Sequence, residues 1–229
     1  MQKFAVDWKS LKCGEHRPID KDTHYGEEGT PLRKLQNNCS AKHCMMIAAC
    51  KLKGWDLSSY LLPSHPLQKF IIENINSLCE LSDQESISLA VDGCGLPTYT
   101  LLTQNILKGF SKLNLASGDE TIVKLIQSLV NYPFYVSGYD RLDYELSIAL
   151  GGQVVCKSGA GGLIVIAFQE PTYGALVLKM YDSDEKVKAL VVKAILEKLG
   201  YKLNSSHNLF SSEILNLHNL PCAKVSTFC

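Results

Sequence analysis

The chain has 229 residues, 46% of them hydrophobic, which is enough for one domain with a real core. Its 23 Lys and Arg residues are equal in number to its 23 Asp and Glu residues. A neutral chain lacks the basic surface of a nucleic-acid-binding protein and the charge that an anionic membrane surface would attract, so both partner classes are excluded.

The apolar runs of the chain are short. The longest, 44–50 and 163–168, fall far below the roughly 20 residues that cross a bilayer. The first twelve residues contain no apolar stretch of the signal-peptide type, so we expect a cytoplasmic protein. The nine cysteines are then expected to be reduced, most of them as small buried hydrophobes and a few as metal ligands or catalytic groups.

The first half of the chain predicts two helices and a strand after a polar, irregular start. A helix over 39–53 ends at Gly54, and a second helix begins near Pro66, which suits a first turn. Alternation over 87–91 predicts a strand that leads into a loop at 92–97. The expected apolar stripes are Met45, Ala48, Ala49 and Leu52 in the first helix and Leu67, Phe70, Ile71, Ile75 and Leu78 in the second.

The second half predicts helices around an antiparallel meander. Ser117 and Glu120 match a capping box for a helix that stops before Pro133, and Asp140 is expected to cap a short helix ending at Gly151. Three β-rich segments, 153–156, 163–168 and 175–181, are joined by turn-like links at 157–162 and 170–174.

A last helix is predicted over 184–199, before a weakly patterned tail. Its expected apolar face is Val187, Leu190, Val191, Ala194, Ile195 and Leu199. With no internal repeat or low-complexity linker, the chain predicts a single domain over 1–229. Its expected class is α+β, with helices packed on an antiparallel sheet.

Cys39 and Lys42 form the first candidate for chemistry. They lie three residues apart at a predicted helix start, so their side chains share a face. The helix N-terminus and the neighbouring ammonium favour a thiolate, which could be a nucleophile or a metal ligand. The alternative is a helix start with a buried cysteine and a solvated lysine. His43 is the one histidine beside these candidates, and its alternative is a surface residue of the helix.

Asp92 and Cys94 form the second candidate, in a loop where glycines allow close backbone approach. The carboxylate could orient a ligand, whereas the alternative is a tight turn with an incidental cysteine. Neither Cys39 nor Cys94 belongs to a C-x-x-C pair, so a metal site would have to be assembled across the fold.

The third candidate is Lys157-Ser158-Gly159, at the end of a predicted strand. Penicillin-binding enzymes line their sites with a K-[ST]-G strand, although an ordinary hairpin turn can have the same three residues. Those enzymes also need S-x-x-K on a helix. Only Ser183 has a lysine three residues on, at Lys186, and we expect Ser183 to cap the last helix.

Together these stretches resemble one known family, the rhizobial-type (class 3, asparaginase II) L-asparaginases. The matching stretches are Asn37-Asn38-Cys39-Ser40-x-Lys42-His43, His65-Pro66-Leu67-Gln68, Val91-Asp92-Gly93-Cys94-Gly95-Leu96-Pro97 and Lys157-x-Gly159-Ala160-x-Gly162, after an opening Leu11-Lys12-Cys13-Gly14-Glu15-His16-x-Pro18. The match runs from about Leu11 to about Gly200 and is far more specific than any single motif.

The resemblance implies a fold similar to serine β-lactamases and glutaminases, and hydrolysis of L-asparagine to L-aspartate and ammonia. It implies a zinc site whose ligands would be Cys39, Lys42 and Cys94, with Lys157 as a catalytic base. Asp92 and His43 would bind substrate or support the ligands. A neutral lysine amine as ligand requires a strongly lowered pKa, which a bound cation can supply. The family also implies a homodimer and leaves the choice between asparagine and glutamine open.

Three departures from the family pattern bear on activity. The family's nucleophilic serine comes from S-x-x-K and S-H motifs upstream of the matched stretches, so we expect an N-terminally truncated, incomplete domain that is inactive. Gly161 stands where the family usually has Glu, and the tail from Asn204 does not match the family's usual ending. Two rivals remain: a non-catalytic zinc-binding or interaction protein, and a cysteine-dependent amidohydrolase with Cys39 or Cys94 as nucleophile.

Overall fold

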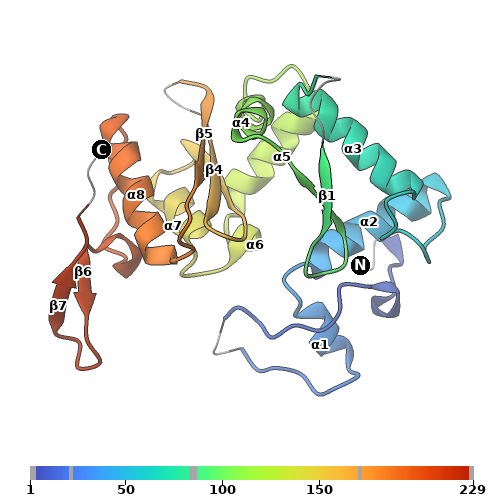
Figure 1. The fold of residues 1–229 in the computed structure, drawn as a ribbon, viewed down its shortest axis with the longest axis horizontal. Coiled ribbons are helices and arrows are strands. Elements are labelled where there is room, and N and C mark those ends of the chain that lie inside the picture. Colours follow the sequence, from blue (N-terminus) through green and yellow to red (C-terminus); the bar gives the residue numbers. More distant parts are fainter. Residues whose placement is uncertain (1–3, 21–22, 83–86, 170–171, 227–229) are drawn as a thin grey trace. The chain divides into compact units, whose positions relative to one another are not determined.

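A computed structural model describes residues 4–20, 23–82, 87–169 and 172–226 (Figure 1). Within these ranges the chain forms eight α-helices and three small antiparallel sheets, so the predicted α+β class is confirmed. The chain divides into two compact units, Met1–Ser77 with Leu81–Leu101 and Leu78–Glu80 with Leu102–Cys229, each of which we describe by itself. The single domain and the β-lactamase-like arrangement stay predictions.

The first unit combines helices with a two-stranded hairpin. Its elements are a 3-10 turn Trp8–Ser10, α1 (Pro31–Leu35), α2 (Ser40–Lys53), most of α3 (Pro66–Cys79), β1 (Ser88–Val91) and β2 (Pro97–Thr100). Both predicted helices and the strand are confirmed. Gly54 ends α2 in the left-handed conformation, with φ of 68°. The core contains Val6, Leu11, Cys13, Ile47, Ala48, Cys50, Tyr60, Leu67, Cys94 and Leu96.

The predicted stripe of α2 is confirmed at Ala48, which is buried, and is wrong at its two ends. Met45 and Leu52 are 68% and 73% exposed, while His43 and Ile47 are fully buried. The core lies on the face that contains His43, Ile47 and Cys50, and Tyr60 gives the buried imidazole a hydrogen-bond partner there. In α3, Leu67 is buried as expected, whereas Phe70 and Leu78 are exposed.

The second unit is built on a three-stranded sheet. Strands β3 (Val154–Ser158), β4 (Leu163–Phe168) and β5 (Gly174–Lys179) pair antiparallel in that order, which confirms the predicted meander; the predicted link 170–174 lies partly outside the described residues. The other elements are α4 (Thr103–Ser111), α5 (Glu120–Asn131), α6 (Phe134–Ser137), α7 (Leu142–Ala149), α8 (Glu185–Lys198), a 3-10 turn Asn208–Phe210, β6 (Glu213–Leu215) and β7 (Pro221–Lys224).

Helices cover both faces of this sheet (Figure 1). One face packs with α7 and α8 into the core of the unit, and α4 and α5 contact the other. The middle strand is therefore buried on both sides, and Ile164, Val165, Ile166 and Ala167 are at most 3% exposed. The main core contains Leu142, Leu146, Leu150, Val154, Cys156, Ile164, Ile166, Phe168, Ala189, Val192, Leu196, Tyr201 and Phe210.

Three predicted helix caps are wrong. Asp119 caps α5 by accepting from the Thr121 N–H (2.7 Å), while Ser117 bonds only the Asp119 N–H. Asp184, not Ser183, caps α8 by accepting from the Val187 N–H. In both of these cases an acid one or two residues later caps the helix instead. Asp140 does not cap α7, which begins at Leu142.

The end of the chain also departs from its pattern. Of the predicted α8 face only Leu190 is buried, and Leu199 is 56% exposed, because the helix turns Ala189, Val192 and Leu196 to the sheet. The weakly patterned tail contains a β6–β7 hairpin that the sequence did not predict.

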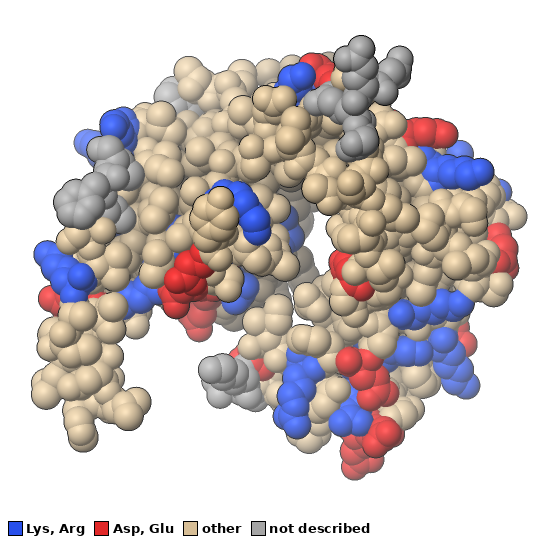
Figure 2. All heavy atoms as spheres, viewed as in Figure 1, with Lys and Arg blue, Asp and Glu red and all other residues tan. Residues whose placement is uncertain are grey.

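The surface agrees with the balanced composition. On the face that Figure 2 shows, Lys and Arg side chains are interspersed with Asp and Glu. Among the described residues no helix is both long enough and apolar enough to cross a membrane.

Candidate functional site

A polar turn before α2 fixes Cys39. The Asn37 side chain is buried; its Oδ1 accepts from the Cys39 N–H (2.8 Å) and its Nδ2 donates to the Cys13 carbonyl (2.8 Å). One amide side chain thus ties the N-terminal Cys13-Gly14 turn to the start of the helix. Cys39 is the residue immediately before α2, so its thiol lies at the helix N-terminus, as the sequence predicted.

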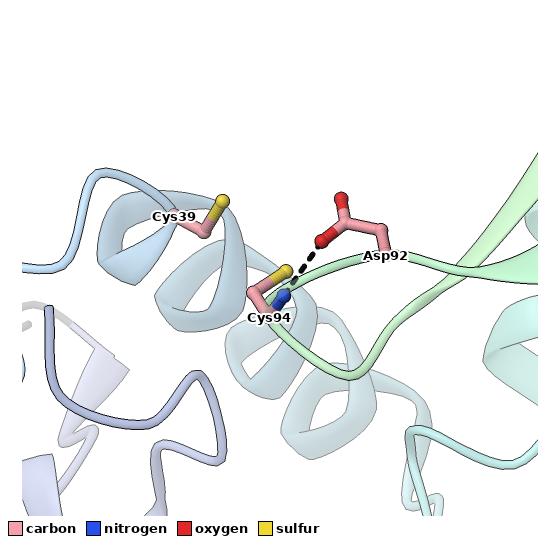
Figure 3. Close-up of side chains that lie close together, drawn as sticks. All are labelled: Cys39, Asp92 and Cys94. Carbon is pink, nitrogen blue, oxygen red and sulfur yellow. Dashed lines mark hydrogen bonds between the residues drawn. The ribbon is translucent and has the colours of Figure 1, made fainter. Parts of the chain in front are cut away.

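The β1–β2 loop fixes Asp92 and Cys94. The Asp92 N–H donates to the Leu96 carbonyl (2.9 Å), and Gly95 closes the turn with φ of 83°, a conformation that favours glycine. The Cys94 N–H donates to Asp92 Oδ1 (2.7 Å), the bond drawn in Figure 3. The glycines of the motif therefore let the backbone present a carboxylate and a thiol side by side.

These two segments bring their chemistry to one place in the first unit. The Sγ atoms of Cys39 and Cys94 and a carboxylate oxygen of Asp92 all lie within 4.8 Å of one another (Figure 3). Lys42 reaches the same group, with Nζ 3.4 Å from Asp92 Oδ2. Four predicted site residues thus meet, although the helix and the loop are about fifty residues apart in the chain.

The ionisable side chains of this group shift one another's pKa values. Burial and the bonded Asp92 carboxylate raise the pKa of the Cys94 thiol to about 11. Burial lowers the pKa of Lys42, but the charges of Cys39, Cys94 and Asp92 outweigh burial and raise it above its ordinary value. Two thiols and a carboxylate are ligands that zinc takes, and a cation among them would reverse both shifts. The residues therefore fit a zinc ion.

His43 lies behind this group and is fully buried. The Tyr60 hydroxyl accepts from the Lys12 N–H (2.9 Å) and forms a second hydrogen bond with His43 Nδ1 (2.6 Å). The other ring nitrogen, Nε2, has no hydrogen-bond partner. Burial and the nearby Lys42 lower the pKa of His43 to about 4, which keeps the imidazole neutral. In this position His43 supports α2 from the inside.

The polar side chains of the His65-Pro66-Leu67-Gln68 motif bond backbone groups of the first unit. His65 Nε2 bonds the Asp56 carbonyl (2.9 Å), and its Nδ1 accepts from the Leu67 N–H at the start of α3. Gln68 Nε2 donates to the Tyr60 carbonyl (2.8 Å). The motif therefore holds the segment that carries Tyr60, the partner of His43.

Lys157 lies in the second unit, on β3. Its side chain is 56% exposed; Nζ donates to the Ser158 carbonyl (2.8 Å) and lies 3.5 Å from Asp143 Oδ2. Asp143, on α7, is buried and accepts with Oδ1 from both the N–H and the hydroxyl of Ser158. Asp143 was not predicted from the sequence, because an acid in the first turn of a helix is common at a solvated surface. Its burial depends on packing, and nothing in the local sequence signals it.

Gly161 has a positive φ of 62°, and a Cβ there would lie 3.1 Å from Lys179 Nζ. The Lys179 ammonium donates to the Gly161 carbonyl. In this chain a lysine of β5 therefore occupies the space beside the position where the family pattern has Glu.

A second group of ligand-type residues lies in the same unit. Asp140, Glu145 and His207 each place one ligand atom within 4.8 Å of the others. However, the Leu209 N–H donates to His207 Nδ1 (3.2 Å), so the ring proton is on Nε2, which faces Asp140 Oδ1 at 3.0 Å. That nitrogen has no lone pair for a metal, and the group joins the tail to the start of α7.

Comparison with known proteins identifies the family. A search of curated proteins finds no match to the chain. The family model described as L-asparaginase II matches residues 1–227, nearly the whole chain. The chain therefore belongs to the L-asparaginase II family, whose type is an L-asparaginase-like amide hydrolase.

Proposed function

We propose that the site is that of an L-asparaginase-like amide hydrolase, which would convert the side-chain amide of L-asparagine, or of a similar small amide, to the acid and ammonia; the ammonia assay below tests this against the inactivity expected from the absent serine motifs. The observation that supports this best is the meeting of Cys39, Cys94, Asp92 and Lys42 in a member of this family. Cys39, Cys94 and Lys42 would hold zinc, with Asp92 beside them. A bound zinc ion supplies a Lewis acid that polarises a carbonyl oxygen or a water molecule.

The residues of the chain have distinct roles in this proposal. Asp92 bonds the Cys94 N–H with one oxygen and faces the Lys42 ammonium with the other, so it sets the geometry of the loop and balances the charge of the lysine. His43 stays neutral and fixes α2 through Tyr60. Lys157 provides the amine that takes up and returns a proton as base.

The geometry weighs against the rival with Cys94 as nucleophile. Cys94 is 5% exposed, and its thiol has a pKa of about 11, so without a cation it is protonated at neutral pH. A buried thiol of this kind is a poor nucleophile and a good candidate for a metal ligand.

Metal content and ammonia release test the proposal together. Purified wild type, Cys39→Ser and a control, Cys222→Ser, whose cysteine is exposed and outside the group, are analysed for zinc by mass spectrometry and for ammonia release from L-asparagine. We expect one zinc per chain in wild type and control, loss of zinc in Cys39→Ser, and ammonia release that follows the metal.

The other outcomes separate the alternatives. Zinc without ammonia would favour the non-catalytic zinc-binding or interaction protein. Folded wild type without zinc, in zinc-supplemented buffer, would contradict the metal site. A homodimer, also implied by the family, is tested by sedimentation of the same samples.

A further inference from the structure

The lysine motif of the second unit contains a buried carboxylate that no part of the proposed reaction uses. Asp143 is 2% exposed and lies in the first turn of α7, where the free N–H groups of the helix favour a negative charge. Burying a carboxylate is costly unless it is fully bonded. The contacts of Asp143 show what offsets that cost.

Both oxygens of Asp143 are engaged, and they have different partners. Oδ1 accepts from the Ser158 N–H (2.8 Å) and from the Ser158 hydroxyl (2.6 Å). Oδ2 faces Lys157 Nζ at 3.5 Å. One carboxylate thus bonds two consecutive side chains of the motif, which follow each other on the edge strand β3.

If Asp143 only joined α7 to β3, its two hydrogen bonds with Ser158 would be sufficient. The contact with Lys157 adds nothing to the packing of the unit, because the lysine side chain is 56% exposed. It does restrict the ammonium, which is also held by the Ser158 carbonyl (2.8 Å). A free lysine side chain has about 2 kcal/mol of rotamer entropy to lose on being ordered. If the Lys157 side chain is already ordered in the free protein, this entropy cost does not arise in the chemical step.

We propose that Asp143 is a positioning residue for Lys157: it holds the lysine amine in one place at the end of β3 and orients the Ser158 hydroxyl beside it. Because Asp143 takes the hydroxyl hydrogen, Ser158 presents only acceptor lone pairs to its surroundings. The remaining donor of Lys157 and the acceptor of Ser158 therefore form a fixed pair that suits a polar amino-acid substrate. A role of Asp143 in catalysis rests on the proposed function, whereas the contact between Asp143 and Lys157 can be tested without an activity assay.

Asp143→Asn separates the two contacts. The amide keeps an oxygen for both Ser158 donors and replaces the oxygen facing Lys157 with an NH2 group, which cannot accept from the ammonium. Glu120→Gln is the matched control, because Glu120 forms an exposed pair with Lys124 at 3.0 Å in the same unit. Ser158→Ala is the second variant, since it removes the hydroxyl bond and leaves the Lys157 contact.

Site-resolved acylation of lysines, read by mass spectrometry on the full chain, measures how firmly Lys157 is held. We expect Asp143→Asn to raise the acylation rate of Lys157 about two- to fivefold, the range that a partly exposed ion pair gives. Lys179 on β5 serves as the internal reference. Its acylation rate should equal the wild-type rate in Asp143→Asn, and also in Glu120→Gln and Ser158→Ala. General loosening of the unit would instead raise both lysines. An unchanged Lys157 rate in folded Asp143→Asn, or equal rises at Lys157 and Lys179, overturns the inference.

Wild type provides a measurement that needs no variant. Lys157 should react more slowly than Lys124, which pairs with the exposed Glu120. The reverse order contradicts the inference even if Asp143→Asn does not fold.

Ammonia release then tests the catalytic meaning. We expect Asp143→Asn to lower kcat by about tenfold or more with KM within about twofold, because a misplaced base affects the chemical step. When Asp143→Asn is combined with Lys157→Ala, the double variant should have the same kcat as Lys157→Ala alone. Wild-type kcat in Asp143→Asn overturns the role. If wild type releases no ammonia, the proposed function fails, while the acylation rates still decide whether Asp143 holds Lys157.

Discussion

Single side chains decide which parts of the motifs do chemistry and which support it. Asn37, Tyr60 and His65 lie within or beside the stretches that resemble the family, but their contacts are with backbone groups or with His43. They hold α2 and its neighbours in place. Cys39, Asp92 and Cys94, by contrast, point their reactive atoms at one another (Figure 3).

Tyr60 gives a pH-dependent prediction at this scale. Its fully buried phenol has its pKa raised from 10.0 to about 12, chiefly by burial. Between these values the folded chain keeps the phenol proton that the unfolded chain has lost, so the folded state binds more protons and stability falls as pH rises. We expect this group to contribute a loss of about 2 kcal/mol across that interval.

Chemical denaturation of wild type and Tyr60→Phe between pH 9 and about 12 measures this contribution. The variant is less stable at pH 9, because His43 loses its partner, but its unfolding free energy should fall less steeply above pH 10. Tyr181→Phe is the control, since Tyr181 is fully exposed. Equal slopes in wild type and Tyr60→Phe would contradict the prediction.

At the scale of elements, turns and caps place the site. The β1–β2 loop presents Asp92 and Cys94 because Gly95 adopts a positive φ. The β3–β4 turn has the same requirement at Gly162, which follows the lysine motif and has a φ of 76°. Backbone geometry therefore explains Gly95 in the first motif and Gly162 in the second.

Gly162→Ala tests the second turn. A Cβ there would lie 2.7 Å from the Met180 carbonyl oxygen and 2.8 Å from that of Asp182, in a conformation that L residues rarely adopt. Strain and overpacking together should lower the free energy of unfolding by about 2–4 kcal/mol. The measurement is urea denaturation, with Gly118→Ala as control, because a Cβ at Gly118 meets open space. A loss equal to that of the control would show that the turn can rearrange.

At the scale of the whole molecule, the proposed metal site joins segments that are distant in the chain. Cys39 comes from the start of α2, and Cys94 from the β1–β2 loop. An ion held by both binds the folded state and not the dispersed ligands of an unfolded chain, so it stabilises the fold by mass action.

Removal of the metal should therefore lower the melting temperature. With zinc at about a hundred times its Kd, the stabilisation is about 2.7 kcal/mol. We expect a chelator to lower the Tm of wild type and of Cys222→Ser, zinc to restore it, and Cys39→Ser to be insensitive to both. A Tm of wild type that ignores chelator and added zinc would argue against the site.

The sequence by itself predicted the elements and the family. Strong patterns decide these: the apolar run 163–168 between two turn-like links indicates a buried strand, Gly54 and Pro66 delimit their helices, and the ordered motifs around Cys39, Cys94 and Lys157 resemble the L-asparaginase II family, to which the chain belongs. Such signals are local, so they can be read without knowing what lies opposite.

Only the tertiary structure decided which face of each helix is buried and which groups meet. The inner face of α2 contains a histidine beside Ile47, Ala48 and Cys50, and the partner of that histidine, Tyr60, is seventeen residues away in the chain. The Asp119 cap, the meeting of Asp92 with two thiols and the link from Asp143 to Lys157 likewise depend on distances through space. Burying a polar side chain is costly without a hydrogen-bond partner, and the position of that partner is set by packing rather than by spacing along the chain.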